Sequence, residues 1–377
     1  MAGMRTPRPL LLAALLVLAA GVPARPLHDF GDADAATDAL VAGYALPGAS
    51  LRLATGTGEV HRRHVGTYDE ATRVPIASAS KWLSALTLAR LVEAGELRWD
   101  STVGDYFPEA PAAVRGITVD QLFSHTSGIA TDEADCLSAR GVTLQQCAQE
   151  ILARPLAWAP GSVFAYGGNS MQVAGALAER ATGRSWDAIF QAEMVVPLGL
   201  TGTDWTAAAV RHGYVPNANP RIAGGARSTL ADYSRVVDMV LAGGEVDGEA
   251  FLSPLTLAVM ARDRTVGLPI ADSPDSRTDQ GYGLGQWVEE RDVHGATTRV
   301  SSPGAFGFTP WVDWRQGSNG VLLVRGNGSQ MRNDINALQR ACLDALEPVR
   351  ELQETASPAL LPRRTAPPRL DATRRAH

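Results

Sequence analysis

The sequence predicts an α+β protein in which both ends of the chain build one sheet and a helical lobe is inserted between them. Runs typical of strands lie at residues 49–54 and 59–65, and again at 282–289, 297–301, 309–313 and 321–325. Between these two groups the apolar pattern has a helical period, from residue 78 to about 262. This order favours one sheet assembled from both ends of the chain with an inserted helical lobe, and a cleft where the two meet.

Each element follows from a local pattern. A short amphipathic segment at 33–45 precedes the first strands, and Thr-Gly-Thr-Gly at 55–58 joins those strands as a hairpin. Helices are expected at 78–94, 118–123, 144–153, 170–182, 186–195 and 230–242. An amphipathic helix at 331–346 follows the last strand.

Both termini differ from this core in composition. Residues 1–24 resemble a secretory signal, because Arg5 and Arg8 precede an apolar run that ends before Val22-Pro23-Ala24. The apolar run is too short to span a bilayer, so we expect a periplasmic or secreted protein without a stable membrane span. The folded domain is expected over 25–349, and the tail at 350–377, rich in proline and arginine, is expected to be disordered.

Charge and cysteine content narrow the possible partners. The net charge is −6, and removal of the signal takes away two of 34 basic residues and none of 40 acidic ones, which gives −8 and disfavours nucleic acid. In an oxidising compartment, Cys136 and Cys147 are predicted to form a disulfide; two reduced thiols in a core are the alternative. Cys342 is expected to be a buried free thiol, and His61 and His64 do not indicate a metal site.

Lys81 is the single lysine of the chain, whereas arginine occurs 33 times. Arginine stays protonated in proteins, so a position that keeps lysine indicates a need for an amine that can lose its proton. Ser78 precedes Lys81 by three residues, which places both side chains on one face of the expected helix, one turn apart. The pair therefore reads as a nucleophile and its activator at a helix start.

Three further segments accompany this pair, in a characteristic order. They are Gln-Leu-Phe-Ser-His-Thr-Ser-Gly-Ile at 121–129, Phe-Ala-Tyr-Gly-Gly-Asn-Ser-Met-Gln at 164–172, and Ser-Pro-Gly-Ala-Phe-Gly-Phe at 302–308. With Ser-x-x-Lys, they resemble the serine β-lactamase superfamily, especially its class C β-lactamase and esterase branch, over residues 33–346. The stretch Ala-Gly-Gly-Ala-Arg-Ser-Thr at 223–229 fits the same branch. The resemblance implies the β-lactamase and penicillin-binding-protein transpeptidase-like fold, which is an antiparallel sheet flanked by helices plus a helical lobe.

The resemblance also implies roles for individual residues. Ser78 attacks a carbonyl carbon and becomes acylated, while Lys81 and Tyr166 share the proton, with Tyr166 as general base. The backbone N–H groups of Ser78 and Ala305 form the oxyanion hole. Gly304 lets the strand edge approach the substrate. The remaining substrate-binding positions are Ser302, Gly168 and Asn169. His125 is expected to fix its turn by hydrogen bonds rather than to act on substrate.

Two departures from the family pattern bear on the substrate. The second motif is usually Tyr-x-Asn, but Gly168 stands at the third position and the asparagine is displaced to Asn169. The third motif, Lys-Thr-Gly in β-lactamases, is Ser302-Pro303-Gly304, which lacks the lysine that anchors a substrate carboxylate. Arg299 and Arg227 are candidates to replace that cation.

A neutral ester does not need such an anchor. The sequence therefore favours a hydrolase acting on small esters without metal or organic cofactor. A β-lactamase or D-amino-acid peptidase acting on an amide is the alternative within the same chemistry, and a non-catalytic penicillin-binding or cell-wall sensor protein is an alternative of another class.

Overall fold

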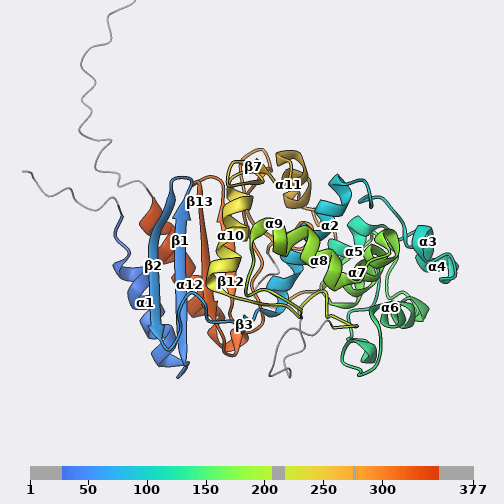
Figure 1. Ribbon diagram of the computed structural model, residues 1–377, viewed down its shortest axis with the longest axis horizontal. Coiled ribbons are helices and arrows are strands. Elements are labelled where there is room, and N and C mark those ends of the chain that lie inside the picture. The colour runs from blue at the N-terminus through green and yellow to red at the C-terminus, as the bar shows by residue number, and fades with distance from the viewer. Residues whose placement is uncertain (1–27, 206–216, 275–276, 278, 348–377) are drawn as a thin grey trace, which may run out of the picture. The chain divides into compact units, whose positions relative to one another are not determined.

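The computed structural model describes residues 28–205, 217–274, 277 and 279–347, and Phe30–Pro348 form one compact unit. The signal segment, the expected tail and the outer boundaries of the predicted domain therefore lie outside the described residues. Within the unit, a sheet with helices on both faces adjoins a region built mainly of helices (Figure 1). No helix among the described residues is both long enough and apolar enough to cross a membrane.

The main sheet has seven antiparallel strands in the order β2-β1-β13-β12-β11-β10-β9. Two come from the start of the chain, β1 (Gly48–Thr55) and β2 (Gly58–Gly66). Five come from its later part: β9 (Gly281–Tyr282), β10 (Trp287–Arg291), β11 (Thr297–Ser301), β12 (Thr309–Asp313) and β13 (Ser318–Val324). Ala49 pairs with Val324, so the two ends of the chain meet inside the sheet. The α+β fold with an antiparallel sheet assembled from both termini is confirmed.

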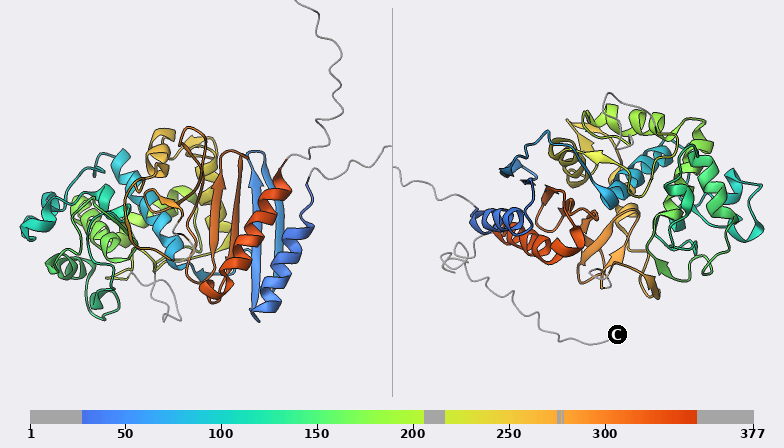
Figure 2. Two further views of the ribbon diagram at one scale, coloured as in Figure 1. Left: turned by 180° about the vertical axis from the view of Figure 1, so that it is seen from behind. Right: turned by 90° about the horizontal axis from the view of Figure 1, so that it is seen from below.

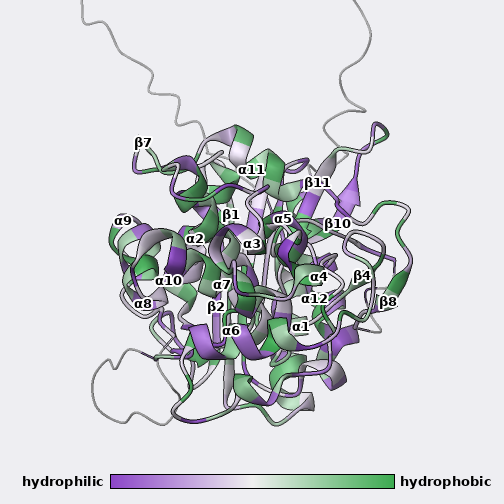
Figure 3. Ribbon diagram, turned by 90° about the vertical axis from the view of Figure 1, so that its right-hand side faces the viewer, coloured by the Kyte–Doolittle hydropathy of each residue, from purple (hydrophilic) through white to green (hydrophobic). Residues whose placement is uncertain are grey.

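Helices cover both faces of this sheet. α1 (Gly31–Gly43) and α12 (Gly328–Leu346) lie side by side on one face, and α10 (Leu230–Leu241) lies on the other (Figures 1 and 2). The alternation of side chains along β1 explains this arrangement, because Leu51 and Leu53 pack beneath α1 and α12 while Arg52 points the other way and binds Asp238 of α10. Figure 3 shows how apolar and polar segments are distributed over the end of the molecule formed by the helical region.

The helical region contains α2 (Ser80–Glu93), α3 (Val103–Tyr106), α4 (Ala112–Arg115), α5 (Val119–Phe123), α6 (Leu144–Ala153), α7 (Asn169–Thr182), α8 (Trp186–Phe190) and α9 (Val196–Leu198). Farther along the chain, α11 (Pro254–Ala261) packs against α2. Helix α2 is buried on nearly all sides, and its residues join the largest apolar cluster. It therefore packs in one apolar cluster with residues of both the helical region and the sheet.

Three two-stranded sheets fix the loops near α2 by backbone hydrogen bonds. β3 (Val74–Pro75) pairs with β5 (Arg227–Ser228), β4 (Phe164–Ala165) pairs in parallel with β8 (Ile270–Asp272), and β6 (Glu245–Val246) pairs with β7 (Glu249–Ala250). β3 ends three residues before Ser78, and β4 ends directly before Tyr166.

Apart from shifted ends, two predicted elements differ in kind from the structure. The strand expected at 282–289 is interrupted, because Gly283 to Gln286 form a turn in which Gly283 N donates to Gln286 O at 2.9 Å, which separates β9 from β10. The helix expected at 186–195 changes pitch, since α8 ends at Phe190 and a π-helical turn follows at Gln191–Val195. Helix α11, for which no helix was predicted, lies between Ser253 as its N-cap and Arg262.

Candidate active site

Ser78 lies in a tight turn directly before α2. Ala77–Ala79 form one turn of 3-10 helix, and Ala77 has a φ of 45°, in the left-handed region that alanine rarely adopts. Strain of this kind costs about 1–3 kcal/mol and is concentrated at functional sites. The helix therefore begins two residues later than predicted, and Ser78 stands on the turn at its N-terminal end.

Lys81 meets Ser78 directly. Its Nζ donates to Ser78 Oγ at 3.1 Å and to the carbonyl oxygen of Ala223 at 2.9 Å. Lys81 is only 4% exposed, so its amine is held between these two oxygens inside the protein. The Ala223 carbonyl comes from the 223–229 stretch, and the contact spans 142 residues of sequence. The amine is thus placed to take or return a proton at the serine oxygen.

Tyr166 lies beside the same amine. Lys81 Nζ is 4.6 Å from the centroid of the Tyr166 ring. The backbone of Tyr166 is fixed by donation from its N–H to Asp272 O at 2.9 Å, and its ring stacks on Trp287 with centroids 5.2 Å apart. The structure therefore brings together the three residues to which the sequence assigns catalysis.

The third motif lies against the turn that carries Ser78. A Cβ atom at Gly304 would fall 2.1 Å from the carbonyl oxygen of Ile76, so only glycine allows this approach. Gly328 N donates to Ala305 O at 2.9 Å and fixes the next residue. Within the described part of the chain, the N–H of Ala305 meets no acceptor, as an oxyanion donor requires.

Ser302 and Asn169 use their polar atoms on the protein itself. Ser302 Oγ donates to the carbonyl oxygens of Ser78, at 3.2 Å, and Gly285, at 3.3 Å. Asn169 is 1% exposed; its Nδ2 donates to Ala130 O at 2.8 Å and Asp132 O at 2.9 Å, and its Oδ1 accepts from the N–H of Ala134. The geometry assigns Asn169 to the 130–134 loop and gives its substrate-binding prediction no support.

Gly168 lies near Ala223, whose carbonyl oxygen accepts from Lys81. A Cβ there would come no closer than 3.8 Å to Ala223 and Leu137, so the position borders the segment that receives the Lys81 amine without being sterically closed. Its predicted role in substrate binding remains a prediction.

The two arginines considered as replacement cations are both held by acids. Arg299 binds Glu289, Glu290 and Asp313, and Arg227 binds Asp204. Arg332 differs, because its Nη1 is buried and meets no acceptor within the described residues. Burial lowers the pKa of Arg332 to about 10, aided by Arg277 and opposed by charge interactions with Tyr166 and Glu289. Arg332 therefore lies within electrostatic range of Tyr166, and no sequence motif indicated that it would.

The cysteine predictions hold. Cys136 and Cys147 form a disulfide, and Cys342 is a buried free thiol whose pKa is raised to about 12 by burial. Among the described residues, no group of three or more histidine, cysteine, aspartate or glutamate side chains is arranged to hold a metal ion.

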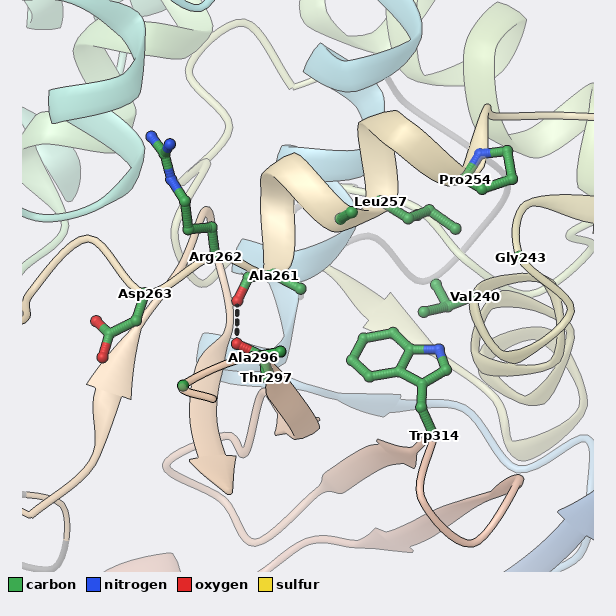
Figure 4. A pocket seen from close by; sticks show the side chains of 12 residues that line it. Val240, Gly243, Pro254, Leu257, Ala261, Arg262, Asp263, Ala296, Thr297 and Trp314 are labelled. Atoms are coloured by element: carbon green, nitrogen blue, oxygen red, sulfur yellow. Dashed lines mark hydrogen bonds between the residues drawn. The ribbon is translucent and has the colours of Figure 1, made fainter. Parts of the chain in front are cut away.

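A separate pocket of about 440 Å³ lies between α10, α11 and the β10–β11 turn (Figure 4). Its walls include Val240, Leu257 and the indole of Trp314, and they contain none of Ser78, Lys81 or Tyr166. The chemistry of the site therefore does not lie in this hollow.

Comparison with known proteins agrees with this geometry. The sequence profile of the family described as Beta-lactamase matches residues 33–344. Penicillin-binding protein 4 of Amycolatopsis lactamdurans is 29% identical, over 85% of this chain and 91% of its own length. Esterase EstB of Burkholderia gladioli is 30% identical, over 48% of this chain and 53% of its own length.

Solved structures show the same architecture. A protein reported as a candidate β-lactamase from Bacteroides dorei superposes with a TM-score of 0.73 at 27% identity, covering 85% of this chain and 99% of the other. A family VIII carboxylesterase superposes with a TM-score of 0.64 at 19% identity, covering 83% and 97%, a likeness of fold alone. With the match to the family profile over most of its length and Ser78, Lys81 and Tyr166 gathered at one site, this chain belongs to the β-lactamase family and is a serine hydrolase.

Proposed function

We propose that this serine hydrolase is an exported carboxylesterase that cleaves small neutral esters through an acyl-enzyme on Ser78. The observation that carries the proposal is the third motif. Its Pro303 has no polar side chain, and the hydroxyl of Ser302 is turned inward onto two carbonyl oxygens. This segment offers a substrate neither a cation nor a free hydroxyl, which suits an ester without a carboxylate.

The catalytic steps follow from the contacts of the three residues. Ser78 Oγ forms a bond to the acyl carbon as its proton passes to the Lys81 and Tyr166 pair, and the oxyanion lies between the N–H groups of Ser78 and Ala305. The proton then passes to the alkoxide leaving group as the C–O bond breaks. Water then attacks the acyl carbon while Tyr166 accepts its proton; the bond from that carbon to Ser78 Oγ breaks, the proton returns to Oγ, and the carboxylic acid is released. The similarity to Esterase EstB supports this assignment.

A β-lactam or a peptide ending in a D-amino acid is the second candidate substrate. Arg332 favours it, because an arginine with a buried Nη1 that meets no acceptor among the described residues is suited to bind a carboxylate. The similarity to a penicillin-binding protein over most of the chain supports the same reading.

Initial rates of hydrolysis of p-nitrophenyl butyrate, nitrocefin and an acyl-D-Ala-D-Ala peptide separate the two substrates. The esterase proposal expects turnover of the butyrate, loss of at least about a thousandfold in Ser78→Ala, and no change in Ser138→Ala, whose side chain is exposed. Turnover of nitrocefin or the peptide, abolished by Arg332→Met, with no ester turnover would reject the esterase in favour of the second candidate. Stoichiometric acylation by penicillin without turnover of any substrate would instead indicate a binding protein.

Export is the second part of the proposal. It rests on the composition of residues 1–24 and is consistent with the Cys136–Cys147 disulfide, since such bonds persist in oxidising compartments. N-terminal sequencing of the protein recovered from the culture medium or periplasm is expected to begin at Arg25. Recovery of the uncleaved chain from the cytosol would reject export.

A further inference from the structure

His125 is a buried histidine whose conformation is costly in two respects. It follows α5, is 2% exposed and has a φ of 59°, in the left-handed region. A non-glycine residue in that region costs about 1–2 kcal/mol, and a buried polar ring costs more unless its nitrogens are bonded. Its Nε2 is nevertheless buried and meets no acceptor within the described residues. The fold therefore retains His125 at some expense in stability.

The contacts of His125 converge on Tyr166 and its neighbours. The carbonyl oxygen of His125 accepts from the N–H of Ala165 at 2.9 Å, and its Nδ1 accepts from the N–H of Gly167 at 3.4 Å. Its ring centroid lies 4.6 Å from that of Tyr166. The residue before the tyrosine, the tyrosine ring and the residue after it are thus each in contact with one histidine.

The protonation state of His125 leaves Nδ1 free to accept the hydrogen bond from Gly167. Burial, followed by the charge of Lys81, holds the pKa of His125 well below its usual value, so the ring is neutral at physiological pH. Because Nδ1 accepts from Gly167, the proton of the neutral ring resides on Nε2. His125 therefore has no nitrogen with which to abstract a proton from Ser78 or water.

We propose that His125 is a positioning residue, which holds the Tyr166 ring beside the Lys81 amine by binding the backbone on both sides of the tyrosine. This inference concerns how the tyrosine is aligned and rests on the acyl-serine chemistry of the proposed function. A displacement of about 1 Å at a catalytic group costs roughly a hundredfold in rate. The effect is expected on the rate of the chemical step, with little change in KM, because His125 reaches the substrate only through Tyr166.

Two substitutions separate the contacts. His125→Phe keeps the ring but removes the acceptor for Gly167, whereas His125→Asn places an amide oxygen near the former Nδ1 and tolerates the left-handed backbone, but loses the ring. We expect a loss of about 30- to 100-fold for the first and about tenfold or less for the second. His61→Phe is the matched control, since His61 also stacks on an aromatic ring, Phe30, and binds Asp34, but lies on β2 away from the site.

The deciding measurement is a double-mutant cycle with Tyr166→Phe in the full chain. The probe is diethyl p-nitrophenyl phosphate, in which Ser78 Oγ forms a bond to phosphorus, the bond to p-nitrophenolate breaks, and the serine proton passes to the Lys81 and Tyr166 pair. Each active site releases one p-nitrophenolate. If His125 acts through Tyr166, either His125 substitution lowers the phosphorylation rate by less than about threefold in the Tyr166→Phe background.

Multiplicative losses in that background, or a wild-type rate in both single variants, would overturn the proposal. A loss in His125→Asn as deep as that in Tyr166→Phe would overturn it as well, since it would indicate a proton carrier. If His125→Phe does not show a cooperative melting transition, the cycle with His125→Asn decides alone. A wild-type enzyme that releases p-nitrophenolate from the phosphate but does not hydrolyse p-nitrophenyl butyrate refutes the esterase proposal and leaves the test of His125 intact.

Discussion

Gly285 lies so close to helix α2 that no side chain would fit between them. It lies in the turn between β9 and β10 with a φ of +74°, and an added Cβ would fall 2.5 Å from Lys81 O and 2.6 Å from Ala85 Cβ. Its carbonyl oxygen also accepts from Ser302 Oγ. Gly285→Ala therefore combines a backbone penalty of about 1 kcal/mol with overpacking of about 1–3 kcal/mol. We expect the free energy of unfolding to fall by about 2–4 kcal/mol.

Gly295→Ala isolates the backbone part of this effect. Gly295 has a φ of +84°, and an added Cβ there would meet nothing within 4 Å, so a loss of only about 1 kcal/mol is expected. Urea denaturation of both variants, followed by circular dichroism, gives the difference. We also expect Gly285→Ala to lower the acylation rate at least about tenfold, because the turn lies against Lys81. Equal losses of stability in the two variants would refute the close approach of this turn to α2.

Three further outcomes follow from the structure. Cys136→Ser with Cys147→Ser is expected to lower the free energy of unfolding by about 3 kcal/mol for a loop of this length, measured by urea denaturation; an unchanged midpoint would contradict this. Cys342, with its pKa raised to about 12, is expected to resist Ellman's reagent at pH 8 until urea unfolds the protein, and rapid labelling of the native state would contradict its burial. Asn169→Ala is expected to cost about 2–4 kcal/mol through lost bonds to the 130–134 loop while KM for p-nitrophenyl butyrate stays within about twofold; a large rise in KM would instead place Asn169 against the substrate.

The sequence predicts those parts of the site that depend on local spacing. The Ser78 and Lys81 contact follows from a separation of three residues, and the assembly of the sheet from both ends follows from where the period-two runs lie. The contact between Lys81 and Ala223 O depends instead on how two distant segments pack, for which no pattern of either segment gives a distance. The same holds for the bonds of Asn169 to the 130–134 loop and for the stacking of Trp287 on Tyr166, since both depend on tertiary packing.

The interruption at Gly283 to Gln286 shows a second kind of limit. An alternating pattern continues through this stretch, so it reads as one strand. The chain turns there because Leu284 N donates to Met260 O and Gly285 fits against α2, and both are tertiary contacts. The glycines were visible in the sequence, but the element that they approach was not.

The pairing of Ala49 with Val324 also affects when the enzyme becomes active. The turn that carries Ser78 is synthesised early, whereas Gly304, which packs against it, and Ala305, the predicted oxyanion donor, are synthesised more than 200 residues later. Contacts between such distant parts of a chain form slowly and late in folding. A nascent chain would therefore carry Ser78 in an incomplete site. Hydrolytic activity is therefore expected to report completed folding, because Ser78 becomes reactive only when the last strands are in place.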